Sequence, residues 1–362
     1  MTQPDDTRAA RNGEAGCRAG GKRVAVVGAT GQVGRTMLEL LRQRSFPADE
    51  IVLFATPRSA GLEIDGRVVR GLDEDADLTG FEIALFSAGA GTSREWAHRF
   101  AHAGAAVIDN SSAFRRDPNV PLVVSEVNPH ALRNHAGLIA NPNCSTMQLM
   151  VALAPIHRAA GIERLVVSTY QSVSGTGRAA VAELDAQSHA SLHGMEMPAP
   201  EVYPQPIGFN VIGAAGNFAD GEDHTDEERK MMFETRKILE DESIGIAVTC
   251  VRVPVRVGHS EAVNIQTREP LGAAEARELL AAAPGLSLEE DVPTPLRAEG
   301  RDEVFVGRIR RDESHPRALS MWVVSDNLRK GAATNAVQIA ELLMAPTSTP
   351  ATFAERYGPA RT

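Results

Sequence analysis

The first part of the chain alternates between short apolar runs and segments whose apolar residues have helical spacing. After a polar stretch at residues 1–21, rich in Gly, Ala and Arg, the run Arg23-Val24-Ala25-Val26-Val27 begins this alternation. Nearly continuous apolar runs of this length are typical of strands buried on both faces of a parallel sheet. The pattern predicts strands at residues 23–27, 51–55, 83–86, 107–109, 122–124 and 138–140, and helices at 33–41, 93–102 and 147–160.

Beyond residue 161 the apolar residues alternate with polar ones instead of forming continuous runs. Alternation of this kind is typical of strands that have one packed face and one solvated face. It predicts strands at residues 165–173, 247–253, 261–267, 304–310 and 319–324, and a terminal apolar helix at 331–344. The expected fold is a doubly wound α/β domain of the Rossmann type, followed by an α+β domain with a mixed sheet.

These two patterns also set the expected domain boundaries. Residues 22–143 form the first domain, to which a C-terminal helix at about 327–345 returns, and residues 144–326 form the second. We expect the polar stretch 1–21 to be a flexible tail and residues 346–362 to be a C-terminal tail. The stretch 190–206, which contains two Met and four Pro residues, is expected to be a loop or a dimer contact, and this expectation comes from the family resemblance described below.

The composition narrows the class of ligand. The 362 residues are 43% hydrophobic and 23% charged, and 37 Lys+Arg against 47 Asp+Glu give a net charge of −10. This charge gives the chain no general reason to bind nucleic acid or an anionic membrane. Aromatic residues make up only 4%, which argues against base-stacking surfaces and against a large aromatic pocket. A polar small molecule is the expected ligand.

The three cysteines, Cys17, Cys144 and Cys250, are too widely spaced for a disulfide framework or a zinc motif, so we expect no metal site. The acidic N-terminus does not resemble a signal peptide, and no run of about 18 apolar residues occurs. We therefore expect a cytoplasmic protein that neither spans a membrane nor is secreted. Cys17 falls in the tail and is expected to have no role, and Cys250, inside an alternating strand, is expected to be a core residue.

Three glycines, Gly28, Gly31 and Gly34, follow the first predicted strand and precede a helix. Glycines there allow a tight turn, close approach of a phosphate, and a helix N-terminus that favours an anion. The spacing is GxxGxxG, which differs from the GxGxxG of the common dinucleotide fingerprint, and a turn without any ligand reads the same way. The position between a strand and a helix favours a dinucleotide.

The end of the second predicted strand favours NADP over NAD. An NAD site usually places an Asp or Glu there to bind the ribose 2′-hydroxyl. This chain has Arg58 and Ser59 instead, and a guanidinium with a nearby hydroxyl suits a 2′-phosphate. The alternative is that Arg58 is a solvated surface charge.

Cys144 lies in the segment Asn141-Pro142-Asn143-Cys144-Ser145-Thr146, between a predicted strand and a predicted helix. Asn143 can cap that helix, which places Cys144 in its first turn. We expect the helix N-terminus to stabilise a thiolate there, and its free N–H groups to stabilise an oxyanion nearby. The alternative is a small buried cysteine at a helix start.

A reactive cysteine usually has a base, and His259 is one of ten histidine candidates. It differs from most of the others because it follows a glycine that interrupts a strand pattern. A further candidate is Gln171, which precedes a glycine turn and offers both a donor and an acceptor. Taken alone, that segment is also compatible with a simple turn into a helix.

The motifs taken together resemble the aspartate-β-semialdehyde dehydrogenase family over nearly the whole chain, from about Lys22 to Met344. The resemblance rests on separated motifs in the same order: GATGQVG at 28–34, DNSSAFR at 109–115, NPNCST at 141–146, QSVSGTG at 171–177, RVPV at 252–255, GHS at 258–260 and DNLRKG at 326–331. The family reduces L-aspartyl-4-phosphate with NADPH to the semialdehyde and phosphate, on the route to lysine, methionine, threonine and isoleucine. It assembles as dimers or tetramers, so the resemblance implies a homodimer or homotetramer.

The resemblance also implies roles for individual residues. Cys144 would be the nucleophile, His259 the acid/base, and Gln171 the residue that positions the acyl group. Arg252 would bind the substrate carboxylate and Glu227 the ammonium, while Arg115, Lys230 and Asn143 would bind the phosphate. The implied cofactor contacts are Gly28, Thr30, Gly31, Gln32, Val33, Arg58, Ser59, Ser87, Gly89, Ser174, Gly175 and Asn327. The first domain would then bind NADP, and the second would carry catalysis and dimerisation.

Two other functions remain open from the sequence. N-acetyl-glutamyl-phosphate reductase shares the acyl-phosphate chemistry, but its cysteine typically follows His-Pro-Gly, and this chain has Asn141-Pro142-Asn143. A non-catalytic NADP-binding sensor would keep the glycine turn without needing Cys144 and His259. Without the resemblance, the segment that contains Glu227 and Lys230 reads as a solvated helix face.

Overall fold

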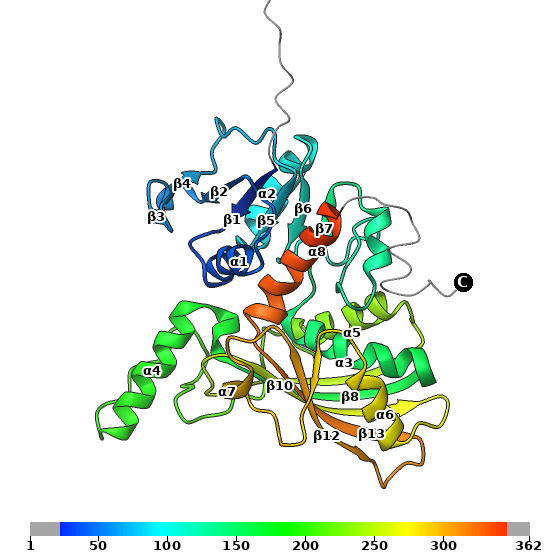
Figure 1. The fold of residues 1–362 in the computed structure, drawn as a ribbon. Helices are drawn as coiled ribbons and strands as arrows, with labels where there is room; N and C mark the ends of the chain where they lie inside the picture. The colour runs from blue at the N-terminus through cyan, green and yellow to red at the C-terminus, as the bar shows by residue number, and fades with distance from the viewer. Residues whose placement is uncertain (1–21, 346–362) are drawn as a thin grey trace, which may run out of the picture.

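A computed structural model describes residues 22–345. The expected tails, and Cys17 with them, lie outside the described residues. Two sheets form the framework, one above the other in Figure 1. The expectation of a Rossmann-type domain followed by a domain with a mixed sheet is confirmed. Ten predicted strands form within three residues of their expected bounds.

The first sheet has the strand order β3-β4-β2-β1-β5-β6-β7, and all its pairs are parallel except β3 with β4. The order reverses beside β1, because β2 and β5 lie on opposite sides of it. Such a switch point opens a crevice at the carboxyl ends of the strands. The strands are β1 (Arg23–Val27), β2 (Glu50–Ala55), β3 (Glu63–Ile64), β4 (Arg67–Gly71), β5 (Ile83–Phe86), β6 (Ala106–Asp109) and β7 (Leu138–Ala140), with helices α1 (Gln32–Gln43) and α2 (Gly89–His102) and short turns η1 (Pro57–Ser59) and η2 (Pro129–Asn134).

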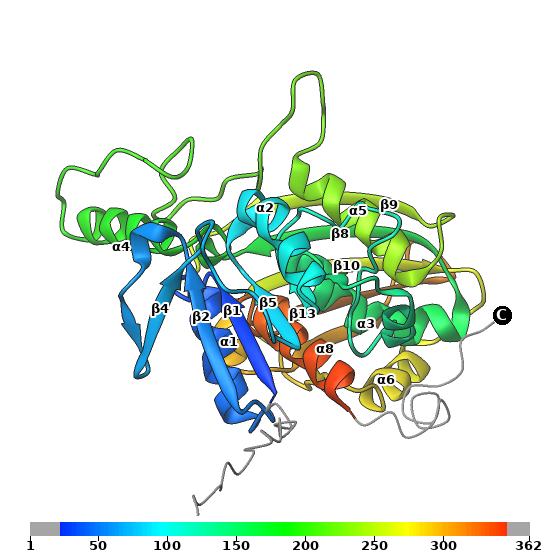
Figure 2. The ribbon, with the colours of Figure 1, turned by 90° about the horizontal axis from the view of Figure 1, so that it is seen from above.

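The second sheet has the order β11-β12-β13-β10-β8-β9 and combines parallel with antiparallel pairs. Figures 1 and 2 show helices between the two sheets, on the face of the second sheet that is turned toward the first. The strands are β8 (Ile162–Gln171), β9 (Gly245–Arg252), β10 (His259–Thr267), β11 (Leu286–Leu288), β12 (Val304–Arg311) and β13 (Ala318–Ser325). The helical elements are α3 (Cys144–Ala160), η3 (Val173–Thr176), α4 (Arg178–Leu192), α5 (Asp226–Leu239), α6 (Ala273–Ala281), α7 (Pro295–Ala298), η4 (Arg329–Thr334) and α8 (Asn335–Met344).

Helix α3 joins the two layers. It is apolar on most sides, and twelve of its residues are buried, so it packs against both the second sheet and α5. It follows β7 after three residues, which brings its N-terminus to the carboxyl edge of the first sheet. Helix α8 returns to that sheet and contacts β5, β6 and α1. A single long helix was expected at 331–344, but its first turn is the π-helical η4, where the Gly331 N–H bonds to the Asp326 carbonyl.

The prediction of a strand at residues 122–124 is wrong. Leu122 forms only an isolated parallel bridge with Ala140. The Asn128 side chain explains this result, because it donates to the Leu122 carbonyl and accepts from the Val124 N–H, both at 2.9 Å. Local side-chain bonds of this kind compete with a sheet ladder for the same backbone groups.

Helix α4 projects to one side of the molecule in both ribbon views, and residues 193–225 beyond it contain no helix or strand (Figures 1 and 2). The stretch 190–206 is therefore largely a loop, as expected. Within residues 22–345, no helix is long and apolar enough to cross a membrane. No group of three or more His, Cys, Asp or Glu side chains in this part of the chain is arranged to hold a metal ion.

Candidate active site

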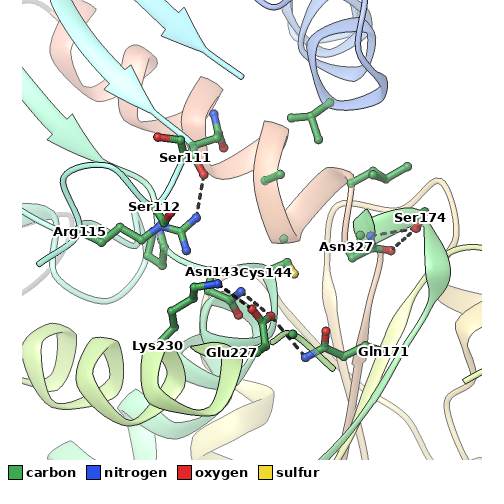
Figure 3. Close-up of a pocket in the computed structure, with 18 of the residues that line it drawn as sticks. Ser111, Ser112, Arg115, Asn143, Cys144, Gln171, Ser174, Glu227, Lys230 and Asn327 are labelled. Atoms are coloured by element: carbon green, nitrogen blue, oxygen red, sulfur yellow. Dashed lines mark hydrogen bonds and ion pairs between the residues drawn. The ribbon is translucent and has the colours of Figure 1, made fainter. Parts of the chain in front are cut away.

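A pocket of about 390 Å³ lies where the carboxyl edge of the first sheet meets α3, α5 and η4 (Figure 3). Of the residues predicted from the sequence, thirteen line it: Val33, Ser87, Gly89, Arg115, Asn143, Cys144, Gln171, Ser174, Gly175, Glu227, Lys230, Arg252 and Asn327. Segments that are far apart in the sequence thus supply one site, and the N-terminus of α3 lies inside it.

Cys144 is the first residue of α3, and Asn143 caps the helix as expected. The Asn143 Oδ1 accepts from the N–H groups of Ser145 and Thr146, at 3.0 and 3.2 Å. This cap has a consequence for the expected oxyanion site, because it occupies two of the N–H groups that were to serve there. In the described part of the chain, the Cys144 N–H is the remaining unbonded donor of this first turn.

The π-helical turn η4 packs directly against the thiol residue. A Cβ added to Gly331 would lie only 2.9 Å from the Cβ of Cys144, and 3.5 Å from that of Asn327. A larger side chain at Gly331 would therefore displace Cys144. Short π-helical segments are frequent at functional sites, and this one lets the chain come close to the thiol.

The surroundings of Cys144 in the ligand-free structure oppose the thiolate that the sequence predicts. Burial raises the pKa of Cys144 to about 12, and the negative charge of Glu227 adds to this effect. Arg252 and Arg115 act in the opposite direction without compensating. Burial and the charge of Glu227 therefore both oppose ionisation of this thiol, and a ligand that neutralises Glu227 would remove the second effect.

We predict that Glu227→Gln makes Cys144 more reactive. The change removes the charge but keeps an oxygen that can accept from the Asn143 side chain, which bonds to Glu227 at 2.7 Å. Each unit by which the pKa falls raises the thiolate fraction about tenfold. The rate of iodoacetamide alkylation at pH 8 should therefore increase in Glu227→Gln. Glu222→Gln, at an exposed position, serves as control, and an unchanged rate in Glu227→Gln would show that the charge does not govern the thiol.

Arg115 reaches the pocket from the loop after β6 and is 8% exposed. Its Nε donates to the Asn141 carbonyl at 2.9 Å, and one terminal nitrogen to the Asn110 carbonyl at 2.7 Å. The other terminal nitrogen forms an ion pair with Glu234 at 3.1 Å. A guanidinium has five N–H donors, so two remain for a ligand.

Lys230 and Glu227 come from one face of α5 and point toward Asn143 and Cys144 in Figure 3. The Lys230 Nζ lies 2.6 Å from Asp226 and 3.4 Å from Glu227. Burial opposes the charge of Lys230, but these two carboxylates hold its pKa above the ordinary value. The helix face that reads as solvated from sequence alone therefore faces the pocket.

Arg252, at the end of β9, is 7% exposed, and one of its terminal nitrogens donates to the Ser172 carbonyl at 2.7 Å. Its Nε is buried and has no partner within the described residues. The guanidinium also lies 5.8 Å from the ring centre of Tyr203. The guanidinium is thus held at one nitrogen, and its other N–H donors lie beside the pocket without partners among the described residues. Such an arginine is suited to bind a carboxylate.

His259 does not line the pocket but lies behind Gly175, whose added Cβ would be 3.4 Å from its Nε2. Its Nδ1 accepts from the Ser172 N–H at 3.0 Å, so the neutral ring carries its hydrogen on Nε2. That Nε2 is buried and without a partner among the described residues. Burial, with Arg252 nearby, lowers the pKa of His259 to about 3.

Asn327 connects this histidine to the glycine turn after β8. Its Oδ1 accepts from the hydroxyls of Ser172 and Ser174, both at 3.1 Å, and from the Gly258 N–H at 2.8 Å. Ser172 in turn touches the His259 ring. Asn327 thus lines the pocket and also holds the residues that orient His259.

The glycine turn fits a phosphate-binding role. Gly28 has a φ of +86°, and a Cβ there would lie 2.3 Å from the Ser87 carbonyl, while a Cβ on Gly34 would lie 2.3 Å from the Gly28 carbonyl. These two glycines are required by the close approach of β1, α1 and the end of β5. Gly31, the N-cap of α1, has only one contact and leaves the helix start open.

The other predicted cofactor residues lie around this turn but outside the pocket. Thr30 and Gln32 flank Gly31 and are half-buried. Arg58 and Ser59 form the short turn η1 directly after β2, and Arg58 is exposed, with no ion pair in the described part of the chain. The Gly28 N–H bonds to the Phe54 carbonyl at 2.8 Å, so the ends of β1 and β2 are adjacent.

Some residues of the site were not predicted. Asn110, Ser111 and Ser112 line the pocket, and they lie in the motif from which only Arg115 was selected. Glu234 contacts Arg115, and its spacing of seven residues from Glu227 could have placed both on one helix face. Cys250 is confirmed as a core residue, since it is fully buried.

Comparisons with known proteins give the same family for both halves. The model for "Semialdehyde dehydrogenase, NAD binding domain" matches residues 23–135, and that for "Semialdehyde dehydrogenase, dimerisation domain" matches residues 153–330. Aspartate-semialdehyde dehydrogenase of Aquifex aeolicus is 53% identical over 335 residues, covering 90% of this chain and 98% of the relative.

Two solved structures extend this likeness. Aspartate semialdehyde dehydrogenase II from Vibrio cholerae, complexed with ASA, has a TM-score of 0.86 and 49% identity, covering 90% of this chain and 99% of that one. The enzyme from Candida albicans, with NADP, has a TM-score of 0.69 and 25% identity over 90% of this chain and 98% of that one.

Proposed function

This chain belongs to the aspartate-semialdehyde dehydrogenase family, and from that membership we propose that its pocket reduces L-aspartyl-4-phosphate to L-aspartate-4-semialdehyde and phosphate. The observation that carries the proposal is the position of Cys144, at a helix start inside a pocket that also contains three cationic side chains and Glu227. This is a step in the biosynthesis of lysine, methionine, threonine and isoleucine.

The charges of the pocket complement those of the substrate. Aspartyl phosphate carries a phosphate, a carboxylate and an ammonium. Arg252 binds the carboxylate through its unsatisfied fork, and Glu227 accepts from the ammonium. Arg115 and Lys230 bind the phosphate, and Asn143 lies beside them with one amide hydrogen uncommitted.

In the first chemical step, the sulfur of Cys144 attacks the acyl carbon. The bond between that carbon and the phosphate oxygen breaks, so Cys144 becomes a thioester and phosphate leaves toward Arg115 and Lys230. The unbonded Cys144 N–H can donate to the developing oxyanion. The Gln171 amide donates to Thr169 and Glu227 at 3.3 and 3.5 Å in the ligand-free protein, and it would join as a donor once the substrate ammonium occupies Glu227. An ammonium bound at Glu227 neutralises the charge that opposes thiolate formation.

His259 acts as hydrogen-bond donor and acid/base. In the neutral ring, the hydrogen on Nε2 is aimed past Gly175 toward the site, where it stabilises the oxyanion. Transfer of the thiol proton to Nε2 requires the other tautomer, with the hydrogen on Nδ1, and the bond that Nδ1 accepts from the Ser172 N–H must then break. The Ser172 hydroxyl, 3.1 Å from Nδ1, can accept a hydrogen from that nitrogen. The aldehyde is released when the reduced thioester carbon expels the Cys144 sulfur.

NADPH, when bound, supplies the hydride that reduces the thioester. The turn at Gly28, Gly31 and Gly34, with Thr30, Gln32 and Val33, would hold its pyrophosphate against the start of α1. Ser87, Gly89, Ser174, Gly175 and Asn327 would surround the nicotinamide half, since they link that turn to the pocket around Cys144.

We predict that Arg58→Ala weakens the preference for NADP. Arg58 and Ser59 follow β2, where the ribose 2′-phosphate would lie, and a charge-assisted bond contributes about 1.5–3 kcal/mol. The ratio of kcat/KM for NADP to that for NAD should fall roughly tenfold or more, mainly through KM for NADP. Arg42→Ala, exposed on α1, is the control, and a ratio equal to that of the wild type would refute the role of Arg58.

The assembly is proposed to be a homodimer or homotetramer in the cytoplasm. Its support is the dimerisation-domain match over residues 153–330. The oligomer has a small-molecule substrate and inorganic phosphate as its ligands, and no metal. Analytical ultracentrifugation of the purified chain measures the oligomeric state directly.

The function itself is tested in the oxidative direction. We expect phosphate-dependent reduction of NADP with aspartate semialdehyde, and little with N-acetylglutamate semialdehyde or with NAD. Preference for the acetylated substrate would support N-acetyl-glutamyl-phosphate reductase instead. NADP binding without turnover of either substrate would indicate a sensor.

A further inference from the structure

Glu234 lies on the same face of α5 as Glu227 and Lys230, about two turns beyond Glu227 and one turn beyond Lys230. Its side chain is 1% exposed, and it does not line the pocket. A buried carboxylate must have good partners, because removing it from water is costly. Its two partners here are both groups of the proposed active site.

Each oxygen of Glu234 accepts from a different segment. Oε1 accepts a hydrogen bond from a terminal nitrogen of Arg115 at 3.1 Å, and Oε2 accepts one from the backbone N–H of Asn143 at 2.7 Å. One side chain therefore joins the proposed phosphate-binding arginine to the residue that immediately precedes the nucleophile. In addition, burial raises the pKa of Glu234, while Arg115 and the Asn143 N–H oppose that shift.

The contact between Glu234 and Arg115 determines which N–H donors of Arg115 remain free to bind a phosphate. Bonds to Glu234, Asn141 and Asn110 hold the guanidinium at all three of its nitrogens. The two uncommitted N–H groups belong to the two terminal nitrogens, which is the arrangement that binds a phosphate at two oxygens. Without Glu234 the guanidinium could rotate away from that orientation.

The contact with Asn143 fixes the start of α3. Asn143 has an extended backbone, with φ −58° and ψ 147°, and its side chain caps the helix. Its N–H lies outside the helix and would be unsatisfied without Glu234. Displacement of this residue would move Cys144, which is bonded directly to it.

We propose that Glu234 is a positioning residue that holds the phosphate-binding guanidinium of Arg115 in register with the thiol of Cys144. The proposal deepens the proposed function, on which it rests. Glu234 touches neither substrate nor cofactor, and it acts through Arg115 and Asn143. Loss of Glu234 should therefore weaken the binding of phosphate more than the binding of the rest of the substrate.

The test compares Glu234→Gln and Glu234→Asp with the wild type in the phosphate-dependent direction. Glutamine keeps the shape but presents an NH₂ group to one of the two donors, and aspartate keeps the charge but is shorter. We expect KM for inorganic phosphate to rise at least tenfold in Glu234→Gln and kcat to fall. KM for NADP should stay within twofold, and Glu234→Asp should recover part of the loss.

Glu228→Gln is the matched control. Glu228 is also buried on α5, but it bonds to the N–H groups of Thr225 and Cys250, away from the pocket. It should lower the thermal midpoint without changing KM for phosphate. If Glu234→Gln leaves that KM at the wild-type value, or shifts it no more than Glu228→Gln does, the proposal is wrong.

A binding measurement keeps this result separate from the proposed reaction. We expect inorganic phosphate to protect Cys144 from iodoacetamide, at a concentration that increases at least tenfold in Glu234→Gln. If the wild type had no turnover but the protecting phosphate concentrations of the two proteins still differed, the proposed reaction would be refuted and the role of Glu234 supported. Equal protection in both proteins would overturn the role of Glu234, whatever the turnover.

Discussion

Replacement of Cys144 by serine is expected to lower turnover by roughly 10⁴-fold or more while NADPH binds as before. Loss of a catalytic nucleophile commonly costs this much, because no other group can form the covalent intermediate. A serine hydroxyl ionises far less readily than a thiol, and its ester would be a poorer acceptor for hydride. The cofactor site should be unaffected, since Gly28 and Gly34 contact the ends of β1 and β5 and not α3.

Cys250→Ser provides the matched control for this prediction. Cys250 is fully buried in the second sheet, so a hydroxyl there should lower stability without removing the reaction. Both variants are measured for turnover and for NADPH binding by nicotinamide fluorescence. Wild-type turnover in Cys144→Ser would mean that the thiol is not the nucleophile.

Replacement of Arg252 by lysine is expected to raise KM for aspartate semialdehyde by roughly 10²-fold. Lysine keeps the charge but loses the fork, and each charge-assisted bond to a carboxylate contributes about 1.5–3 kcal/mol. It also loses the bond to the Ser172 carbonyl, which holds the guanidinium beside the pocket. KM for phosphate should change much less, because the proposed phosphate-binding residues Arg115 and Lys230 lie on other elements than Arg252.

The control for Arg252→Lys is Arg256→Lys. Arg256 lies four residues further along the same segment, is exposed, and pairs with Asp185 at 2.7 Å. Initial rates with each substrate varied in turn separate the individual KM values. An unchanged KM for the semialdehyde in Arg252→Lys, or an equal rise in KM for phosphate, would contradict the assignment.

The pocket resolves an apparent conflict between the charge of the chain and its ligands. A protein of net charge −10 is proposed to bind an anionic substrate and an anionic cofactor. The pocket is lined by the cations Arg115, Lys230 and Arg252 and by the carboxylates Asp226 and Glu227, so cations outnumber carboxylates there, against the balance of the whole chain. Net charge therefore excludes classes of macromolecular partner and does not describe the site.

Much of the fold could be predicted because its elements have strong local signals. The continuous apolar runs of β1 and β5 and the alternation in β10 each indicate one kind of strand. The expected strand at 122–124 failed because Asn128, six residues beyond Leu122, binds the backbone that a strand would need. Apolar pattern alone does not reveal such a side-chain bond.

The site could be predicted only where a motif identifies a residue. Cys144, Arg115 and Arg252 lie in recognisable segments, whereas Glu234 lies in a charged helix and is important only through its contacts. The raised pKa of Cys144 could not be predicted because it depends on burial in the folded protein and on Glu227, which is far away in the sequence. The tautomer of His259 likewise depends on the Ser172 N–H, a contact between β10 and the end of β8.

The central claim, a thioester on Cys144, is tested most directly by mixing the protein with aspartate semialdehyde and NADP in the absence of phosphate. We predict a rapid burst of about one NADPH per chain, because acylation proceeds but release requires phosphate. Mass spectrometry of the quenched protein should then find one aspartyl group on the peptide that contains Cys144. A burst absent at all protein concentrations, or an acyl group on any other residue, would contradict the account.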